Sequence, residues 1–237
     1  LVLCILMSLS SFADDKKDII SPEVIDWSGY NQSLGDIVST PDNPKKIYLY
    51  ATTPNKFVTV GGRYGAQPIF AEVGMNFYVE KIADDADNRY YIHSWVHNPT
   101  TAHEDGTADY LGVEPTMDTD QRIFLTDPKD ETKKSIYLYV DRGFRNVDDK
   151  NDNPSPDRIK WYIDPVVGTN NGYKIYSKWK DNQGGYNDNV ERNYYLSYYI
   201  GNPEEQPQKK FLVVTTDVSK AETFYFIKID DYRNVIN

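Results

Sequence analysis

Cysteine is almost absent from this sequence of 237 residues: its single cysteine is Cys4. One thiol cannot build a disulfide framework or a metal site of several cysteines. Cys4 also lies in the apolar run 1–13, which we interpret as a signal peptide that is removed on export. We therefore expect the exported form to contain no thiol, which excludes disulfide-rich scaffolds and a cysteine nucleophile.

Positive charge is also scarce: the sequence has 26 Lys and Arg residues and 36 Asp and Glu residues, which gives a net charge of −10. Nucleic acids and anionic membrane surfaces are bound by clustered cations, so this balance argues against both as the main partner. Long apolar runs are lacking too: the run 1–13 is too short for a transmembrane helix. We expect no nucleic-acid partner and no transmembrane segment.

The run 1–13 has the features of a signal peptide. It ends Ser11-Phe12-Ala13 and charged residues follow at once, so small residues occupy the −3 and −1 positions of a cleavage site after Ala13. No methionine or basic segment precedes it, and we expect the first few residues to be missing. A secreted or cell-surface location follows. A lipoprotein is the less favoured alternative, because Cys4 lies near the start of the run.

Known catalytic and metal-binding motifs are missing as well. The sequence has no Gly-x-Ser-x-Gly, no phosphate-binding glycine loop and no His-Glu-x-x-His. His93 and His97 are four residues apart, but Asn98-Pro99 follows directly and argues against a helical metal pair. The segment 148–154 lacks the Gly and Glu of a calcium loop. We predict no cofactor, no metal and no enzyme activity, with paired carboxylates as the alternative that the sequence leaves open.

The sequence does contain one strand motif three times, at 76–82, 160–166 and 223–229. Each copy has an aromatic residue, a tyrosine, a large apolar residue, a variable residue, Lys or Pro, and then Ile or Val. Alternate apolar positions are typical of a strand with one buried face. Three copies predict threefold internal repetition.

Each copy of the motif closes a group of four predicted strands. The groups are 47–50, 56–62, 68–73 and 76–82; 90–95, 109–113, 135–140 and 160–166; and 173–179, 194–198, 210–215 and 223–229. We predict an all-β chain and a β-trefoil of three four-strand units, about 12 strands, with pseudo-threefold symmetry. A β-sandwich is the alternative. One extra short strand is expected at 122–125, inside an insertion.

The domain limits follow from the same pattern. Residues 14–44 mix charge, serine and proline, and we expect an extended leader there that Trp27 pins to the domain. The β-trefoil is expected to span 45–229. Residues 230–237 read as the start of a linker or a further domain.

The segment 45–229 resembles the ricin-B-like β-trefoil modules of secreted multidomain proteins of gut bacteria. In those modules a Leu-Tyr-Asn strand leads into Gly-Lys-aromatic-Leu-Thr-x-Gly-Gly, and here the corresponding residues are 48–51 and 55–62. Residues 63–67 and 73–75 are also similar. The Gln-x-Trp signature of the family is replaced, with Asn76, Lys160 and Thr223 at its first positions. The resemblance implies the trefoil fold, with carbohydrate binding as the commonest activity.

Protein sites for sugars usually combine a partly exposed aromatic ring with carboxylates or amides that bind hydroxyls. We expect Trp95 and Trp179 to occupy matching places at strand ends, and a polar loop follows Trp179. The candidate ligand-binding residues are Trp179, Trp95, Asp181, Asn182, Tyr186 and Tyr199. The alternative for both tryptophans is a structural role as plugs of the barrel mouth.

We therefore expect a secreted, non-catalytic lectin-like module whose partner is a glycan or a cell-surface polysaccharide. One competing class is a protein-interaction or protease-inhibitor module that acts through the insertion 114–134. A second is the targeting module of a larger exported enzyme whose catalytic domain follows Asn237.

Overall fold

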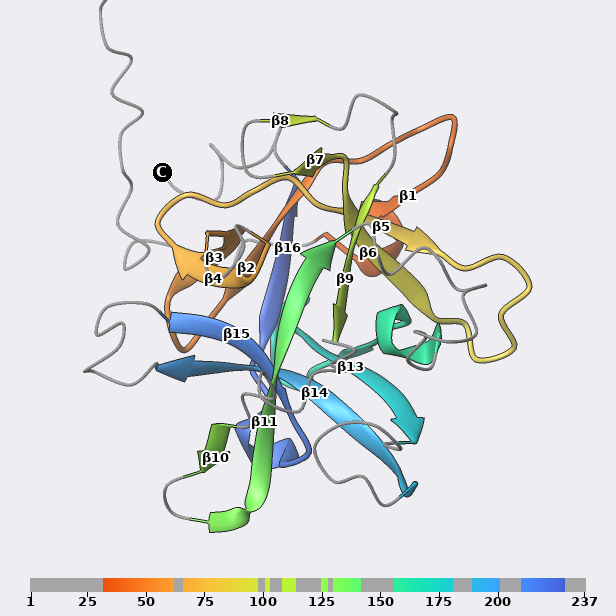
Figure 1. The fold of residues 1–237 in the computed structure, drawn as a ribbon. Coiled ribbons are helices and arrows are strands. Elements are labelled where there is room, and N and C mark those ends of the chain that lie inside the picture. The colour runs from red at the N-terminus through yellow and green to blue at the C-terminus, as the bar shows by residue number, and fades with distance from the viewer. Residues whose placement is uncertain are drawn as a thin grey trace, which may run out of the picture.

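The computed structural model describes residues 32–61, 66–97, 101–102, 108–113, 125–127, 130–141, 156–180, 189–200 and 210–228 (Figure 1). The described chain is all-β, which confirms the all-β part of the predicted fold class. Its strands are β1 (Val38–Ser39), β2 (Ile47–Ala51), β3 (Lys56–Val60), β4 (Pro68–Ala71), β5 (Tyr78–Lys81), β6 (Tyr90–Ser94), β7 (Val96–His97), β8 (Thr101–Ala102), β9 (Asp109–Val113), β10 (Leu125–Asp127), β11 (Asp130–Asp141), β12 (Tyr162–Pro165), β13 (Tyr173–Lys180), β14 (Glu191–Ile200), β15 (Lys210–Thr215) and β16 (Phe224–Lys228). Its helices are α1 (Leu34–Ile37) and the 3-10 turns η6 (Pro156–Ile159) and η7 (Val218–Lys220).

Seven strands close into a barrel in the order β15-β14-β13-β16-β2-β3-β4. All neighbours in this ring are antiparallel, and the pairing of Phe211 in β15 with Ile69 in β4 closes it. Closure pairs the strand edges that would otherwise be open to aggregation. It also gives the ring strands a common interior.

A second sheet, in the order β1-β5-β6-β9-β11, joins the barrel where β11 pairs with β15. Two isolated bridges connect the same parts of the chain at other points. Ile47 at the start of β2 bridges to Phe77, and Tyr90 at the start of β6 bridges to Trp161, one residue before β12. The two sheets are therefore built around one shared core.

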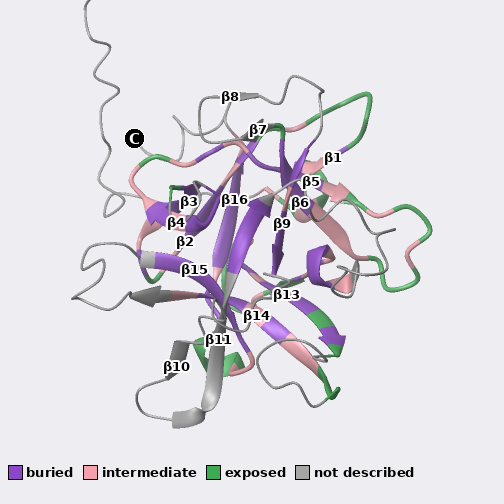
Figure 2. Cartoon of the chain, in the orientation of Figure 1, coloured by how far each residue is buried: buried purple, intermediate pink, exposed green. Residues whose placement is uncertain are grey.

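The core is formed by the inward residues of both sheets, which appear along the central strands in Figure 2. The motif aromatics Phe77, Trp161 and Phe224 each have none of their surface exposed. Trp161 also donates a hydrogen bond from Nε1 to the carbonyl of Leu111, at 3.0 Å. The strand expected in each motif copy is present, and its first aromatic residue is a core residue.

Residues 34–39 depart from the extended leader expected over 14–44. They form α1 and β1, and β1 pairs with β5 in parallel. The Asp36 carboxylate accepts hydrogen bonds from the backbone and hydroxyl of Ser33, which stabilises the first turn of α1. Ile37 is 1% exposed in the core. The leader's Trp27 lies outside the described residues.

The insertion in the second group also differs in detail from the expectation. Its strand β10 spans Leu125–Asp127, and the following strand β11 begins at Asp130, five residues before the predicted position 135. The early part of β11 pairs with β10. In the part of the chain that the structure describes, no helix has the length and hydropathy that a membrane span requires.

Candidate functional site

The predicted site residues Trp95 and Trp179 lie in opposite surroundings. Ser94 and Ser177 are both fully buried, and Trp95 follows Ser94 directly whereas Trp179 lies two residues after Ser177. Because side chains alternate along a strand, the one-residue difference sends the two indoles to opposite faces. Trp95 is 42% exposed and Trp179 is 2% exposed. The two tryptophans therefore do not occupy matching places, contrary to the expectation.

Trp179 lies in the interior of the chain and packs against two side chains. Its ring stacks on Tyr194 with centroids 3.9 Å apart and an interplanar angle of 10°. The guanidinium of Arg158 lies over the indole, 4.2 Å from the ring centroid. Burial on this scale leaves no ring surface for a sugar and supports the structural role that the sequence left open as the alternative.

The other predicted site residues are not placed in the same detail. Tyr199 lies in β14 with its backbone opposite Phe211, and its side chain is outside the described residues. The polar loop of Asp181, Asn182 and Tyr186 falls outside them too, as does the segment 148–154. Within the described ranges, no three His, Cys, Asp or Glu side chains gather as a metal site would require.

Five aromatic side chains meet on the outer face of β5, β6 and β9. This outer aromatic cluster consists of Tyr78, Tyr91, His93, Trp95 and Tyr110. The strand register places Tyr78, His93 and Tyr110 side by side across the three strands. The core uses the alternate residues of the same strands instead. The cluster therefore forms a second aromatic layer outside the core.

His93 is at the centre of the outer aromatic cluster. Its ring stacks on Tyr78 at 5.6 Å and 14°, and lies 5.3 Å from Trp95 at 85° and 5.6 Å from Tyr110. Only 3% of His93 is exposed. These contacts fix the imidazole and, through it, one side of the half-exposed Trp95 ring.

Glu80 places a carboxylate on the same outer sheet face, next to His93. Glu80 Oε2 lies 3.3 Å from His93 Nε2, and the Glu80 side chain is 45% exposed. Burial lowers the pKa of His93, and this effect outweighs the opposite effect of the Glu80 charge. His93 is therefore neutral near pH 7, and its Nε2–H donates to Glu80. Its Nδ1 is buried with no hydrogen-bond partner in the described part of the chain.

No sequence signal marked Tyr78, Glu80 or Tyr110 as site residues. His93 entered only as half of the helical metal pair that Asn98-Pro99 argues against. The available signal was the alternation Tyr91-x-His93-x-Trp95, which places three aromatic rings on one strand face. Which other residues flank them depends on the register of β5 and β9, and that register cannot be read from a single strand.

A second aromatic row lies on β12, β13 and β14. Tyr162 and Tyr176 stack at 4.8 Å and 11°, and Tyr176 meets Tyr195 at 5.0 Å. Burial raises the pKa of Tyr176, and the charge of nearby Asp164 raises it further. The side-chain amide of Asn193 donates a hydrogen bond to the Tyr195 hydroxyl at 3.1 Å. Rings that stack on each other cover each other's faces, so this row is better suited to stabilising the sheet than to stacking on a sugar.

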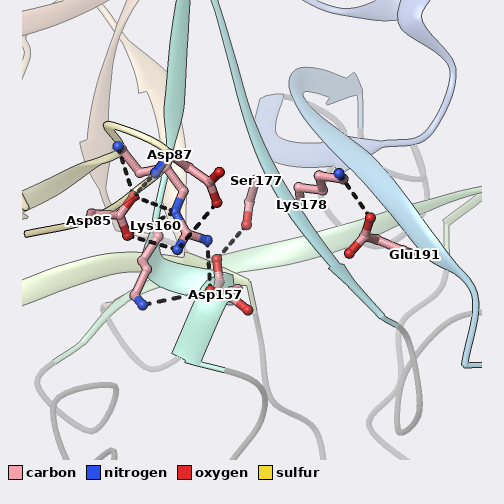
Figure 3. A network of polar contacts seen from close by, with 8 residues as sticks. Asp85, Asp87, Asp157, Lys160, Ser177, Lys178 and Glu191 are labelled. Atoms are coloured by element: carbon pink, nitrogen blue, oxygen red, sulfur yellow. Dashed lines mark hydrogen bonds and ion pairs between the residues drawn. The ribbon is translucent and has the colours of Figure 1, made fainter.

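A charged network holds the turn between β5 and β6, the strands that carry the cluster (Figure 3). Arg89 donates from Nη2 to Asp85 at 2.8 Å and from Nη1 to Asp157 at 2.7 Å. The hydrogen bonds that Asp85 itself accepts from Arg89 lower the pKa of Asp85 to about 2. Lys160 also lies 3.7 Å from Asp157. The network joins the turn to η6 and so restrains β5 and β6 relative to the barrel.

Comparison with known proteins adds no family to this description. No protein-family model matches the chain, and a search of the curated proteins finds no match. The half-exposed Trp95, the buried His93 and the open Glu80 carboxylate are therefore interpreted from their own geometry.

Proposed function

We propose that this chain is an exported, non-catalytic module with a β-trefoil fold, and that it binds glycans on the outer aromatic cluster. The observation that carries the proposal is the half-exposed indole of Trp95 on the same sheet face as the half-exposed carboxylate of Glu80. An aromatic ring offers an apolar surface to the C–H face of a sugar, and a carboxylate accepts hydrogen bonds from its hydroxyls.

The strand pairings support the trefoil part of the proposal. In each predicted unit the first residue of the opening strand pairs with the first aromatic residue of the closing motif. These pairs are Ile47–Phe77, Tyr90–Trp161 and Tyr173–Phe224. The third residue of each opening strand pairs with the motif copy of the preceding unit, as Leu49–Phe226, Ile92–Val79 and Ile175–Ile163.

These pairings trace a second closed path, β2-β5-β6-β12-β13-β16, through the first and last strand of each unit. The two middle strands of each unit pair with each other as β3–β4, β9–β11 and β14–β15. A six-strand ring with three hairpins is the arrangement that a β-trefoil of three four-strand units requires. The fold alone fits several functions, so the ligand class rests on the site.

Several features favour a glycan over other partners. The indole of Trp95 is restrained by edge-to-face contacts with Tyr78 and His93, so little side-chain entropy is lost on binding. The net charge of −10 argues against polyanionic partners. The resemblance to ricin-B-like modules favours carbohydrate as the ligand class, and the apolar run 1–13 favours export.

The test is a glycan-array screen of the purified chain beside two variants. Trp95→Ala removes the half-exposed indole, and Val73→Ala trims a residue that is 60% exposed at another place. We expect saturable binding that Trp95→Ala abolishes and Val73→Ala retains, with both variants unfolding like the parent. A blank array from folded protein, or full binding by Trp95→Ala, would contradict the proposal.

The insertion favours one alternative, a protein-interaction module. Residues 130–134 of β11 pair with β10, and in the described chain they pair with no barrel strand. Figure 1 shows β10 and this end of β11 projecting from the barrel. If this hairpin is the binding element, shortening 116–132 abolishes partner binding and Trp95→Ala leaves it intact.

A further inference from the structure

We propose that Glu80 is the polar half of the Trp95 site and restricts it to uncharged, hydroxyl-rich sugars. This inference rests on the proposed function and adds a ligand class to it. It depends on three observations: the position of the Glu80 carboxylate, the support that His93 gives it, and the charge of the surrounding sheet face.

The carboxylate and the indole flank the same imidazole. Glu80 Oε2 lies 3.3 Å from His93 Nε2, and the Trp95 ring centroid is 5.3 Å from that of His93. Among the described residues, no side chain bonds to the second carboxylate oxygen of Glu80. That oxygen is therefore available to hydroxyl donors of a ligand that rests on Trp95.

His93 acts as a positioning residue in this arrangement. Three aromatic rings hold it, it is 3% exposed, and its Nε2 fixes one oxygen of an otherwise half-exposed Glu80. A carboxylate held in place loses less conformational freedom when a ligand binds. Because one carboxylate oxygen of Glu80 is held by His93, the second oxygen has a defined position on the sheet face.

The combination of Glu80, His93 and Trp95 occurs in only one of the three predicted units, among the residues that the structure describes. The strand register gives the position of His93 to Tyr176 and Tyr50 in the other two units. The same register gives the position of Glu80 to Asp164 and Ile227. The third unit keeps a held carboxylate, since Tyr176 is hydrogen-bonded to Asp164. The place of Trp95, in contrast, is taken by Lys178 and Thr52 in the other two units. A repeat that only stabilises the sheet has no need of a half-exposed indole beside the carboxylate, so this departure from threefold symmetry points to a ligand.

The sheet face around Glu80 selects by charge. The outward residues of β5, β6 and β9 include the Glu80 carboxylate and no lysine or arginine. Arg89, just before β6, is engaged by Asp85 and Asp157. Lys81, the exposed last residue of β5, alternates to the other face of the strand. A sugar carboxylate or sulfate placed on Trp95 would lie beside Glu80 with no lysine or arginine on this face of the three strands to offset the repulsion.

The experiment compares matched sugars by titration of the whole chain. The probes are neutral glucose-, galactose- and mannose-based oligosaccharides, each beside a counterpart that carries a uronic acid in place of one hexose. We expect a neutral sugar to bind at least about tenfold more tightly than its acidic counterpart. In Glu80→Gln, whose amide oxygen still accepts hydroxyl donors, the ratio falls below about threefold.

Two further variants separate specificity from simple damage. Asp164→Asn removes one carboxylate at the equivalent place of another unit, and we expect the wild-type ratio there. His93→Phe keeps an aromatic ring but cannot hold Glu80, so neutral sugars should bind about threefold to tenfold more weakly, with the fold intact by near-UV circular dichroism.

The outcomes distinguish the two levels of the proposal. If no neutral or acidic sugar binds the folded chain, the proposed function fails and this inference fails with it. If sugars bind and Trp95→Ala abolishes binding, but the neutral-to-acidic ratio is near one or is unchanged in Glu80→Gln, the glycan site stands and the role of Glu80 is overturned.

Discussion

The rings of Trp179 and Tyr194 lie 3.9 Å apart and nearly parallel inside the barrel, on the neighbouring strands β13 and β14. Both residues are at most 2% exposed. The guanidinium of Arg158 in η6 lies over the same indole, which adds a cation–π contact in a desolvated place. Trp179 thereby ties η6 to two barrel strands, and its contribution is expected in stability.

Trp179→Ala should lower the free energy of unfolding by about 3–5 kcal/mol, because it deletes a fully buried ring and leaves a cavity. Trp179→Phe keeps part of the stacking and should cost less. Urea unfolding followed by circular dichroism measures both variants. A Trp179→Ala variant that is as stable as the parent but no longer binds a glycan would contradict the structural role and restore Trp179 as a ligand contact.

Asp85→Asn should lower the stability at pH 7 by about 1.5–3 kcal/mol, the usual contribution of hydrogen bonds to a charged group. Asp85 accepts from Arg89, and only 5% of its side chain is exposed. Asp87→Asn is the control, since Asp87 is 56% exposed and 3.8 Å from Arg89. We expect that control to cost less than about 1 kcal/mol.

The same contact predicts a dependence on pH. The pKa of Asp85 is lowered to about 2 in the folded chain, from about 3.9 in an unfolded one. The stabilisation is therefore complete above about pH 4 and is lost as the pH falls toward 2. Unfolding midpoints measured from pH 5 to pH 2 should fall less steeply in Asp85→Asn than in the parent. Parallel curves would show that other carboxylates control the acid transition.

The strands were predictable because a period of two leaves a clear trace in apolar residues. The prediction for 109–113 matches β9 and that for 210–215 matches β15. The same alternation also places Trp95 and Trp179 on opposite faces, because Trp95 is one residue after its serine and Trp179 is two residues after its serine. Reading the two as matching places overlooked the parity that decides which face a side chain occupies.

The candidate site was harder to predict because it depends on contacts between strands. Glu80 and His93 are 13 positions apart in the chain, and their contact follows from the register of β5 and β6. That register is fixed by the buried pair Val79–Ile92 and by the turn that Arg89 holds. α1 was missed for another reason: a helix of four residues is too short to show a helical period.

Glu222→Ala should lower the stability by about 1.5–3 kcal/mol, because it removes a buried acceptor of three hydrogen bonds. Glu222 is 3% exposed, and its Oε1 accepts from the Thr52 hydroxyl, the Thr53 amide and the Thr223 amide. Thermal unfolding of Glu222→Ala beside Glu72→Ala, whose side chain is 41% exposed, measures the difference. Equal losses in the two variants would show that the buried hydrogen bonds contribute little.

His93→Phe should remove a pH-dependent part of the stability. Burial lowers the pKa of His93 in the folded chain below the value of about 6.5 that histidine has when unfolded. Between those two values the unfolded chain binds more protons, so stability is lost as the pH falls below about 6.5. Urea midpoints at pH 5, 6, 7 and 8 should show this loss in the parent and a flatter profile in His93→Phe. A parent that gains stability on acidification would contradict this prediction and would show that attraction between a charged His93 and Glu80 outweighs burial.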